Sequence, residues 1–304
     1  MKTTHKRNLL AVVLVGAMTL IGAELFTSAA SAAETNPDIS VPAVRGKGFT
    51  DNAAGASGAA ISDEELAKKL LNPVAALISV PFIFLGDYGI GPDDGKRLTL
   101  SIQPVIPFEL NKDWNLISRT LIPLIGQQDI PAGTEDSGLG DILTTLYLSP
   151  VELTKGWIWG VGGALVLPTA TEAALGGKKW AIGPTVLALR QERGWTYGAL
   201  VNQTWSVAGD ESRDEVNRMF LQPFVGYTTP DGWNYTTWAE TTIDWNRGSG
   251  NKNATQLYLT AAKVVNLGGQ RVQFEAGPTY WAADTDASPS GWGWRANFVL
   301  LFPK

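Results

Sequence analysis

The chain alternates apolar and polar residues with a period of two. Between Arg97 and Leu110, the even positions carry mostly large apolar side chains and the odd positions mostly polar ones. A period of two places successive side chains on opposite faces of an extended strand. The pattern continues almost to the C-terminus, so the chain must fold as a row of strands whose apolar faces are buried in a protein core or in lipid.

After Pro73 the alternation predicts twelve strands. Most are longer than the 9–11 residues that a tilted strand needs to cross a bilayer, and an even number is typical of single-chain bacterial barrels. We therefore predict an all-β protein, a single closed antiparallel transmembrane β-barrel with a short N-terminal helix. The predicted strands cover residues 76–88, 97–110, 114–126, 139–149, 156–168, 179–191, 195–207, 216–229, 233–245, 254–266, 271–282 and 291–302.

The predicted connections alternate between short and long. The short ones are residues 111–113, 150–155, 192–194, 230–232 and 267–270, and the long ones are 89–96, 127–138, 169–178, 208–215, 246–253 and 283–290. Outer-membrane barrels have short periplasmic turns and longer outer loops. The alternation therefore predicts which end of the barrel faces which compartment.

Most of the 12 tryptophans lie near predicted strand ends. Indole rings favour the headgroup level of a membrane, so we expect two aromatic girdles. A soluble β-sandwich, the competing fold, has no reason to place its tryptophans in this way. The predicted inner girdle is Trp114, Trp157, Trp195 and Trp233, the outer one is Trp180, Trp205, Trp245, Trp281 and Trp292, and Trp238 lies in mid-strand.

Four segments follow from the sequence. Residues 1–32 have a positive start, an apolar run and a small-residue cleavage site, which predicts a signal peptide. Residues 33–61 are predicted to form a flexible segment, and residues 73–304 are predicted to form the barrel. Ser62 and Glu65 form a capping box that predicts a short helix over 62–72. This helix is too short to be stable alone, so it must lie at the barrel mouth or enter the barrel as a plug.

Composition limits the chemistry. The chain has no Cys, and its one His is His5, inside the predicted signal peptide. We therefore predict no metal site, no cofactor and no enzyme activity, because a chain without this histidine cannot build the Ser–His or Asp–His sites of barrel enzymes. Acidic residues number 29 against 24 basic ones, and no basic stripe is present. This balance argues against a nucleic-acid partner and favours cations or neutral molecules slightly as solutes.

The polar face of the strands predicts the residues of the lumen. We expect Arg119 and Arg295 to form a constriction, because each lies near the middle of its strand. Charged groups of both signs in a lumen can line a selectivity path, or they can pair with one another and only stabilise the barrel. The other lumen candidates are Gln103, Glu109, Asp141, Asn202, Gln222, Glu240, Asp244, Glu275 and Asn297.

Strands 76–88, 114–126 and 139–149 alternate poorly. They place several large apolar side chains on the face that elsewhere is polar. Such a wall could pack against the short helix or guide an apolar or aromatic solute. The residues concerned are Ile83, Leu85, Leu121, Leu143 and Tyr147.

Several longer motifs support the same fold. They lie at residues 72–82, 101–107, 113–120, 138–141, 167–171, 205–209, 220–224 and 301–304. In these motifs the chain resembles a family of Gram-negative outer-membrane β-barrels catalogued as transporters of the meta-pathway of phenol degradation. The resemblance covers nearly everything after residue 70 and implies an outer-membrane barrel of transporter type, without a defined substrate.

Together these features predict a channel in the outer membrane of a Gram-negative bacterium. It would pass small solutes, with aromatic or hydrophobic compounds among the candidates, by passive or facilitated diffusion. The alternative is a structural or surface-receptor barrel without significant conductance. The expected partners are membrane lipid and lipopolysaccharide, the solute, and the barrel-assembly machinery, which would engage the C-terminal strand.

Overall fold

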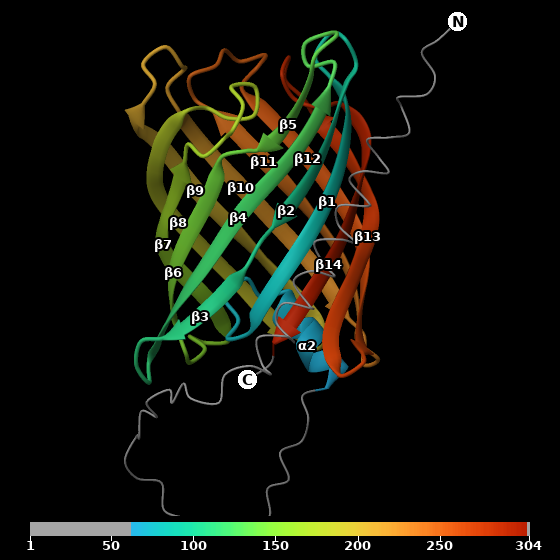
Figure 1. Ribbon diagram of the computed structural model, residues 1–304. Helices are drawn as coiled ribbons and strands as arrows, with labels where there is room; N and C mark the ends of the chain where they lie inside the picture. The colour runs from blue at the N-terminus through green and yellow to red at the C-terminus, as the bar shows by residue number, and fades with distance from the viewer. Residues whose placement is uncertain (1–61, 303–304) are drawn as a thin grey trace, which may run out of the picture. The chain divides into compact units, whose positions relative to one another are not determined.

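The computed structural model describes residues 62–302, which form a closed antiparallel β-barrel and one short helix (Figure 1). The predicted twelve-stranded barrel is confirmed, with two of its strands each broken into two segments. The segments are β1 (Ile78–Ile90), β2 (Gly95–Ile102), β3 (Val105–Glu109), β4 (Trp114–Gln128), β5 (Glu135–Leu139), β6 (Ile142–Pro150), β7 (Trp157–Leu167), β8 (Lys179–Glu192), β9 (Trp195–Gly209), β10 (Asn217–Thr228), β11 (Trp233–Asp244), β12 (Asn253–Leu267), β13 (Gln270–Ala283) and β14 (Gly291–Phe302).

The two broken strands flank β4. Segments β2 and β3 pair with β4 in a single register, and the gap between them falls at Gln103 and Pro104. Proline has no N–H to donate to a ladder, so a break at this position is expected. Segments β5 and β6 pair with the other edge of β4, and their gap falls at Gly140 and Asp141. Each pair of segments therefore acts as one strand of the barrel.

The barrel closes between its first and last strands. β1 and β14 pair antiparallel from Ile78 opposite Phe302 to Gly86 opposite Trp294. Every other pairing joins strands that are neighbours in the sequence. Closure satisfies the hydrogen-bonding groups at both edges of the sheet, which would otherwise invite aggregation.

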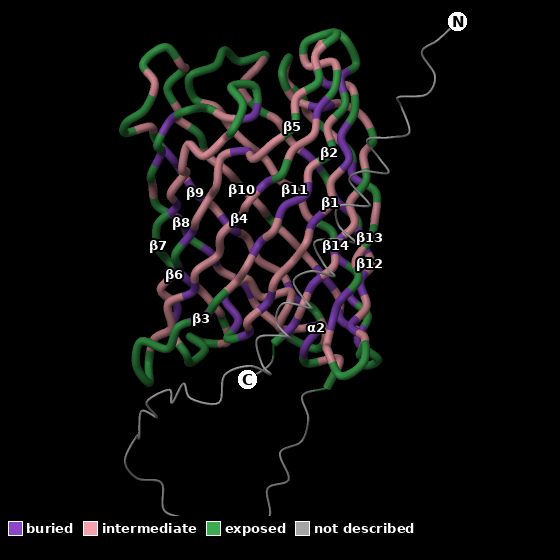
Figure 2. Tube along the Cα trace, in the orientation of Figure 1, coloured by how far each residue is buried: buried purple, intermediate pink, exposed green. Residues whose placement is uncertain are grey.

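The connections divide between the two ends of the barrel, which we call the short-turn end and the long-loop end (Figure 1). The first connection is shorter than predicted. β1 and β2 are joined by residues 91–94 alone, where Gly91 and Asp94 adopt positive φ angles of 68° and 50°. This left-handed backbone closes a tight turn that the spacing of apolar residues did not reveal. Exposed residues gather in the connections at both ends (Figure 2).

The outer face of the barrel wall is apolar. Large hydrophobic side chains such as Ile182, Leu259 and Phe274 are exposed in mid-strand. Soluble proteins rarely expose a continuous apolar surface that extends over many strands. Among residues 62–302, no helix is long and apolar enough to cross a membrane.

Aromatic rings mark both rims of this apolar face. At the short-turn end, Trp157 contacts Tyr197 edge to face and Trp195 contacts Tyr227, with ring centroids 6.4 and 5.0 Å apart. At the long-loop end, Trp292, which is 67% exposed, contacts Tyr280 at 5.0 Å. These pairs form two bands of the kind that amphipathic rings form at membrane interfaces.

The helix α2 (Asp63–Leu70) lies at the short-turn end (Figure 1). The Ser62 hydroxyl accepts a hydrogen bond from the Glu65 backbone N–H at 3.1 Å, as the capping motif predicts. The barrel wall also binds the backbone carbonyls of the helix. The Asn234 side-chain amide donates to Ala67 O at 2.9 Å, and the Gln191 side-chain amide donates to Lys68 O at 2.8 Å. Both donors belong to strands, so the wall fixes the helix directly.

Residues 63–77, which we call the inner segment, pack inside the barrel. Leu66 and Ala67 of the helix are fully buried and pack with side chains of β12 and β14 such as Val264 and Leu301. Val74 packs with apolar side chains of β4, β6, β8 and β9, including Tyr147. Because these strands belong to opposite walls, the inner segment spans the barrel interior.

Candidate functional site in the barrel lumen

A cavity of about 200 Å³ lies in the lumen beside the inner segment. On β1, the residues that line it are Ser79, Pro81 and Ile83, which fixes the odd positions of this strand as inward-facing. Other strands contribute further residues to the cavity wall, which are Arg119, Gln222, Glu275, Arg295 and Asn297. The alternation of the sequence therefore brings residues from many distant positions to one space.

Arg295 and Glu275 form an ion pair on the wall. Arg295 Nε donates to Glu275 Oε1 at 2.7 Å, and both side chains are largely buried. The two residues lie on neighbouring strands β14 and β13, with Arg295 opposite Gly277. A charge-assisted hydrogen bond at this distance offsets part of the cost of removing both groups from water.

Glu240 accepts three hydrogen bonds in the same wall. The donors are Gln222 Nε2 and Trp238 Nε1, each 3.0 Å from Oε1, and the Tyr258 hydroxyl, 3.1 Å from Oε2. The Trp238 and Tyr258 rings stack, with centroids 4.5 Å apart and planes 4° from parallel. The Arg295 guanidinium lies 5.2 Å from the Trp238 ring centroid, within range of a cation–π contact.

The aromatic part of this cluster was missed from sequence. A signal was present, because Trp238 is the tryptophan in mid-strand and shares its parity with Glu240 on β11. The network continues through Gln256, whose Oε1 lies 2.5 Å from the same Tyr258 hydroxyl and shares its single proton with Glu240, and whose Nε2 donates to Asp87 Oδ1 at 3.0 Å. Polar residues from β1, β10, β11, β12, β13 and β14 are thus joined in one connected set.

Trp281 was predicted to belong to the outer girdle, but its ring does not face outward. Its indole N–H donates to Asp87 Oδ1 at 3.0 Å, so the ring faces inward. Its position beside a long loop suggested an outward ring, but the carboxylate inside the barrel offers its N–H a partner. Buried indole N–H groups usually find such an acceptor.

Arg119 lies on the opposite side of β1 from this network. Its guanidinium donates to the side-chain carbonyl of Gln103, which also lines the cavity. Thr145 on β6 donates to the Arg119 backbone carbonyl at 3.3 Å. Arg119 and Arg295 both reach the cavity, but from different strands and with different partners.

Four other polar candidates lie elsewhere, among them Asp244, which pairs with Arg218 at the long-loop end. The Asp141 carboxylate accepts from the backbone N–H groups of Ala170 and Gly177 at 3.2 and 2.6 Å, so it holds the loop at 168–178 at the long-loop end. Asn202 is buried in the wall on β9, opposite Thr185. Glu109 is exposed at the last position of β3, at the short-turn end.

The apolar candidates also separate. Tyr147 is 0% exposed, packs with Val74 of the inner segment and makes a 3.0 Å hydroxyl contact with Thr185. Gly160 leaves room for this packing, because a Cβ there would lie 3.3 Å from both Val74 and Tyr147. Ile83 instead lines the cavity. Leu121 and Leu143 face each other across β4 and β6, and Leu85 lies opposite Arg295.

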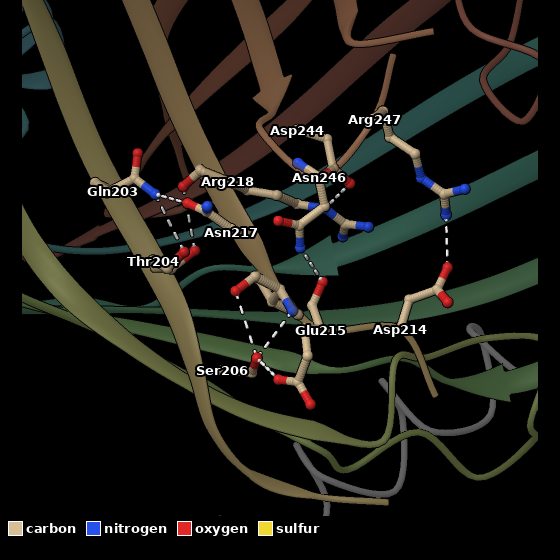
Figure 3. A network of polar contacts seen from close by, with 11 residues as sticks. Gln203, Thr204, Ser206, Asp214, Glu215, Asn217, Arg218, Asp244, Asn246 and Arg247 are labelled. Carbon is tan, nitrogen blue, oxygen red and sulfur yellow. Dashed lines mark hydrogen bonds and ion pairs between the residues drawn. The ribbon is translucent and has the colours of Figure 1, made fainter. Parts of the chain in front are cut away.

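A second polar network joins the loops at the long-loop end (Figure 3). Arg218 pairs with Asp244 at 3.1 Å, and Arg247 pairs with Asp214 at 2.7 Å. The Glu215 carboxylate accepts from Lys179 Nζ at 2.6 Å and from the Ser206 hydroxyl. These two bonds hold the pKa of Glu215 below its usual value of 4.5, the Lys179 contact having the larger effect.

A metal centre would need several convergent carboxylate or imidazole ligands. Within the part of the chain that the structure describes, no group of three such residues meets this need. The lumen offers instead hydrogen bonds, a guanidinium and aromatic faces.

The structure was compared with known proteins to identify its fold. Searches with family models and among curated protein sequences found no match. Among solved structures, the chain is similar to an outer-membrane channel from Pseudomonas putida F1, at 15% sequence identity and a TM-score of 0.59, covering 75% of this chain and 96% of that one. The fold is therefore that of an outer-membrane β-barrel.

Weaker likenesses were found to other outer-membrane barrels. The NanC porin matches at 11% identity and a TM-score of 0.44, covering 75% of this chain and 100% of that one. Outer-membrane phospholipase A from Escherichia coli matches at 11% identity and a TM-score of 0.44, covering 80% of this chain and 99% of that one.

The sequence prediction that this chain is not an enzyme is wrong as a general exclusion, because a missing histidine rules out only the catalytic sites that need one. That prediction used the missing histidine to exclude catalysis, yet an enzyme by its printed name is among the structures that the fold resembles. Fold alone assigns no activity in either direction, because one barrel architecture can carry different sites.

Proposed function

We propose that the protein is a channel in the outer membrane of a Gram-negative bacterium and that it passes small solutes through its lumen. The observation that carries this proposal is the polar cavity beside the inner segment, enclosed by a barrel whose outer face is apolar. Twelve strands lie between the filled eight-stranded barrels and the open porins of 16–18 strands, so the path should be narrow.

The proposal extends to orientation and surroundings. Short turns face the periplasm and long loops the outside in barrels of this class, so the inner segment would fill the periplasmic end. Membrane lipid and lipopolysaccharide would contact the apolar face and the outer loops, and the assembly machinery would engage β14. Residues 1–32, the predicted signal peptide, and residues 33–61 lie outside the described residues. The transporter family suggested by the sequence motifs is part of this proposal.

Within this channel the inner segment acts as a plug. Its helix is held by hydrogen bonds from Asn234 and Gln191, and Val74 seals against the opposite wall. For a solute to pass, this contact must open. The charged residues Arg119 and Arg295 then act as the constriction on the cavity wall.

An engineered disulfide tests the plug directly. The Val74 methyl Cγ1 lies 3.3 Å from the place that a Cβ on Gly160 would take, which brings Val74→Cys and Gly160→Cys within reach of a disulfide. The chain has no native cysteine to interfere. In planar bilayers the reduced double variant should conduct, and oxidation should lower its conductance.

A single-cysteine control makes the result decisive. The single Val74→Cys variant should conduct equally with oxidant and with reductant. A double variant whose conductance is the same before and after oxidation would contradict a mobile plug, whereas no conductance in any form would contradict the channel itself. The second outcome would favour the structural-barrel alternative, which the filled short-turn end also suggests.

A further inference from the structure

Among the residues that the structure describes, two buried polar atoms beside the lumen cavity have no hydrogen-bond partner. They are Asn297 Oδ1 on β14 and Gln273 Nε2 on β13, and the two residues are only 9% and 4% exposed. Both side chains line the cavity. A buried acceptor and a buried donor without partners are costly, so a molecule that enters the cavity and supplies the missing bonds would be stabilised there.

The same cavity has an excess of positive charge at Arg119. Its other cations are compensated, because Arg295 pairs with Glu275 at 2.7 Å and Lys69 pairs with Glu65 at 3.3 Å. Within residues 62–302, Arg119 makes no ion pair, and its guanidinium donates only to the Gln103 side chain. A guanidinium has five N–H donors, and its fork geometry matches a carboxylate.

The two groups are spaced for one small ligand. Asn297 is opposite Ile83 on β1, and the Gln103 backbone N–H donates to Pro81 O on the other edge of β1 at 2.9 Å. Neighbouring strands lie about 4.8 Å apart, so Gln103 and Asn297 are separated by about 10 Å across β1. Arg119 lies beyond Gln103 and reaches back toward it.

We propose that this cavity binds a small carboxylic acid that also carries a hydroxyl group. The carboxylate lies on Arg119, and the hydroxyl donates to Asn297 Oδ1 and accepts from Gln273 Nε2. A cavity of about 150 Å³ holds benzene, so the observed space of about 200 Å³ fits one six-membered ring with its two substituents. The proposal deepens the channel function, on which it rests, by naming an anionic solute class where the charge of the whole chain favoured cations or neutral molecules.

Calorimetric titration of the purified protein in detergent tests the charge requirement. The probes are 4-hydroxybenzoate, 4-hydroxybenzyl alcohol and 4-hydroxybenzylamine, which have similar size and differ in charge. We expect the carboxylate to bind at least about ten-fold more tightly than the other two, as the loss of a charge-assisted bond implies. Equal affinity for the three probes, or no binding of the carboxylate, would overturn the proposal without any variant.

Variants then locate the ligand. Arg119→Gln should weaken 4-hydroxybenzoate binding about ten-fold, whereas Arg190→Gln, at an outward-facing arginine of the same barrel, should leave it unchanged. Asn297→Ala should weaken 4-hydroxybenzoate binding but not benzoate binding, because benzoate has no hydroxyl to lose a partner. An unchanged affinity in Arg119→Gln, or an equal loss for both acids in Asn297→Ala, would place the ligand elsewhere.

Binding and conduction remain separable in this design. Selective binding of the acid by a barrel that never conducts would remove the channel and retain the site. Conduction without selective binding of the acid would retain the channel and remove the proposed site.

Discussion

The two halves of the barrel wall differ in what they present to the lumen. On β4, β6, β8 and β9, inward side chains such as Ile117, Tyr147 and Leu187 are apolar and fully buried against Val74. On β10 to β14 the inward side chains are largely polar or charged and bond to one another, as Glu240 and its three donors do. The Val74 end of the inner segment therefore covers one half. The other half keeps the cavity and meets the inner segment through its helix, as Leu66 does with Val264 and Leu301.

This difference explains the uneven alternation of the sequence. A strand between lipid and water needs one apolar and one polar face, but a strand between lipid and a packed segment can be apolar on both. The poor alternation of the β4 and β6 regions is thus the mark of an internal partner. The comparison yields four tests, taken here from the largest expected effect to the smallest.

Tyr147→Ala should cause the largest loss of stability. The side chain is fully buried between the wall and Val74, and truncation of a buried aromatic residue to alanine costs about 3–5 kcal/mol. Urea unfolding in lipid vesicles would measure it. Tyr147→Phe, which loses only the contact to Thr185, should cost about 1 kcal/mol. Equal losses in the two variants would mean that packing on the apolar half contributes little.

Glu275→Ala should cost less, about 1.5–3 kcal/mol in the same assay, because it removes one charge-assisted hydrogen bond from Arg295. The paired change Glu275→Met with Arg295→Met should recover most of this loss, since buried ion pairs are often replaceable by apolar side chains. If the paired variant is as unstable as the single one, the polar half owes its stability to more than this pair.

Trp238→Ala should cost about 0.5–1.5 kcal/mol beyond the area it exposes, through the lost stacking on Tyr258. Trp245→Ala, at an indole at the long-loop end that donates to Gln203, is a control with no ring stacked on Tyr258. The difference between the two urea midpoints reports the stacking on Tyr258 together with the lost Trp238 contacts to Glu240 and Arg295.

The smallest effect is expected at the network of Figure 3, which spans strands of both halves. The pKa of the Glu215 carboxyl is lowered in the folded state, mainly by Lys179 and then by Ser206. Its contribution is therefore present above the usual value of 4.5 and is lost as the pH falls through the lowered pKa. Limited proteolysis should cut the loops at 210–216 and 245–252 faster at pH 3 than at pH 7.

Lys179→Met provides the matched control for the loops. It removes the first contact of Glu215, so the loops of this variant should already be cut faster at pH 7. A wild-type rate that does not change with pH would assign the closure of the loops to their other bonds, such as Arg247 with Asp214.

Much of the architecture could be predicted from residues alone. A period of two, tight turns, the capping box at Ser62 and the rows of outward tryptophans are local signals, because each depends on spacing within a short stretch. They were enough to predict the twelve strands, the short helix and the parity that sends Arg295, Glu275 and Gln222 to the lumen. Asp141 lies on the same face, yet its carboxylate accepts hydrogen bonds from the backbone N–H groups of Ala170 and Gly177 in a loop near the end of its own strand.

Only the tertiary structure decided which inward groups meet. Val74 reaches Tyr147, and Asn234 reaches the helix 167 residues earlier in the chain, through contacts that no local period encodes. The direction of Trp281 and the isolated charge of Arg119 also depend on what lies across the barrel. The physical reason is that alternation fixes the face of a strand, whereas closure of the barrel and the path of the inner segment fix the partners of that face.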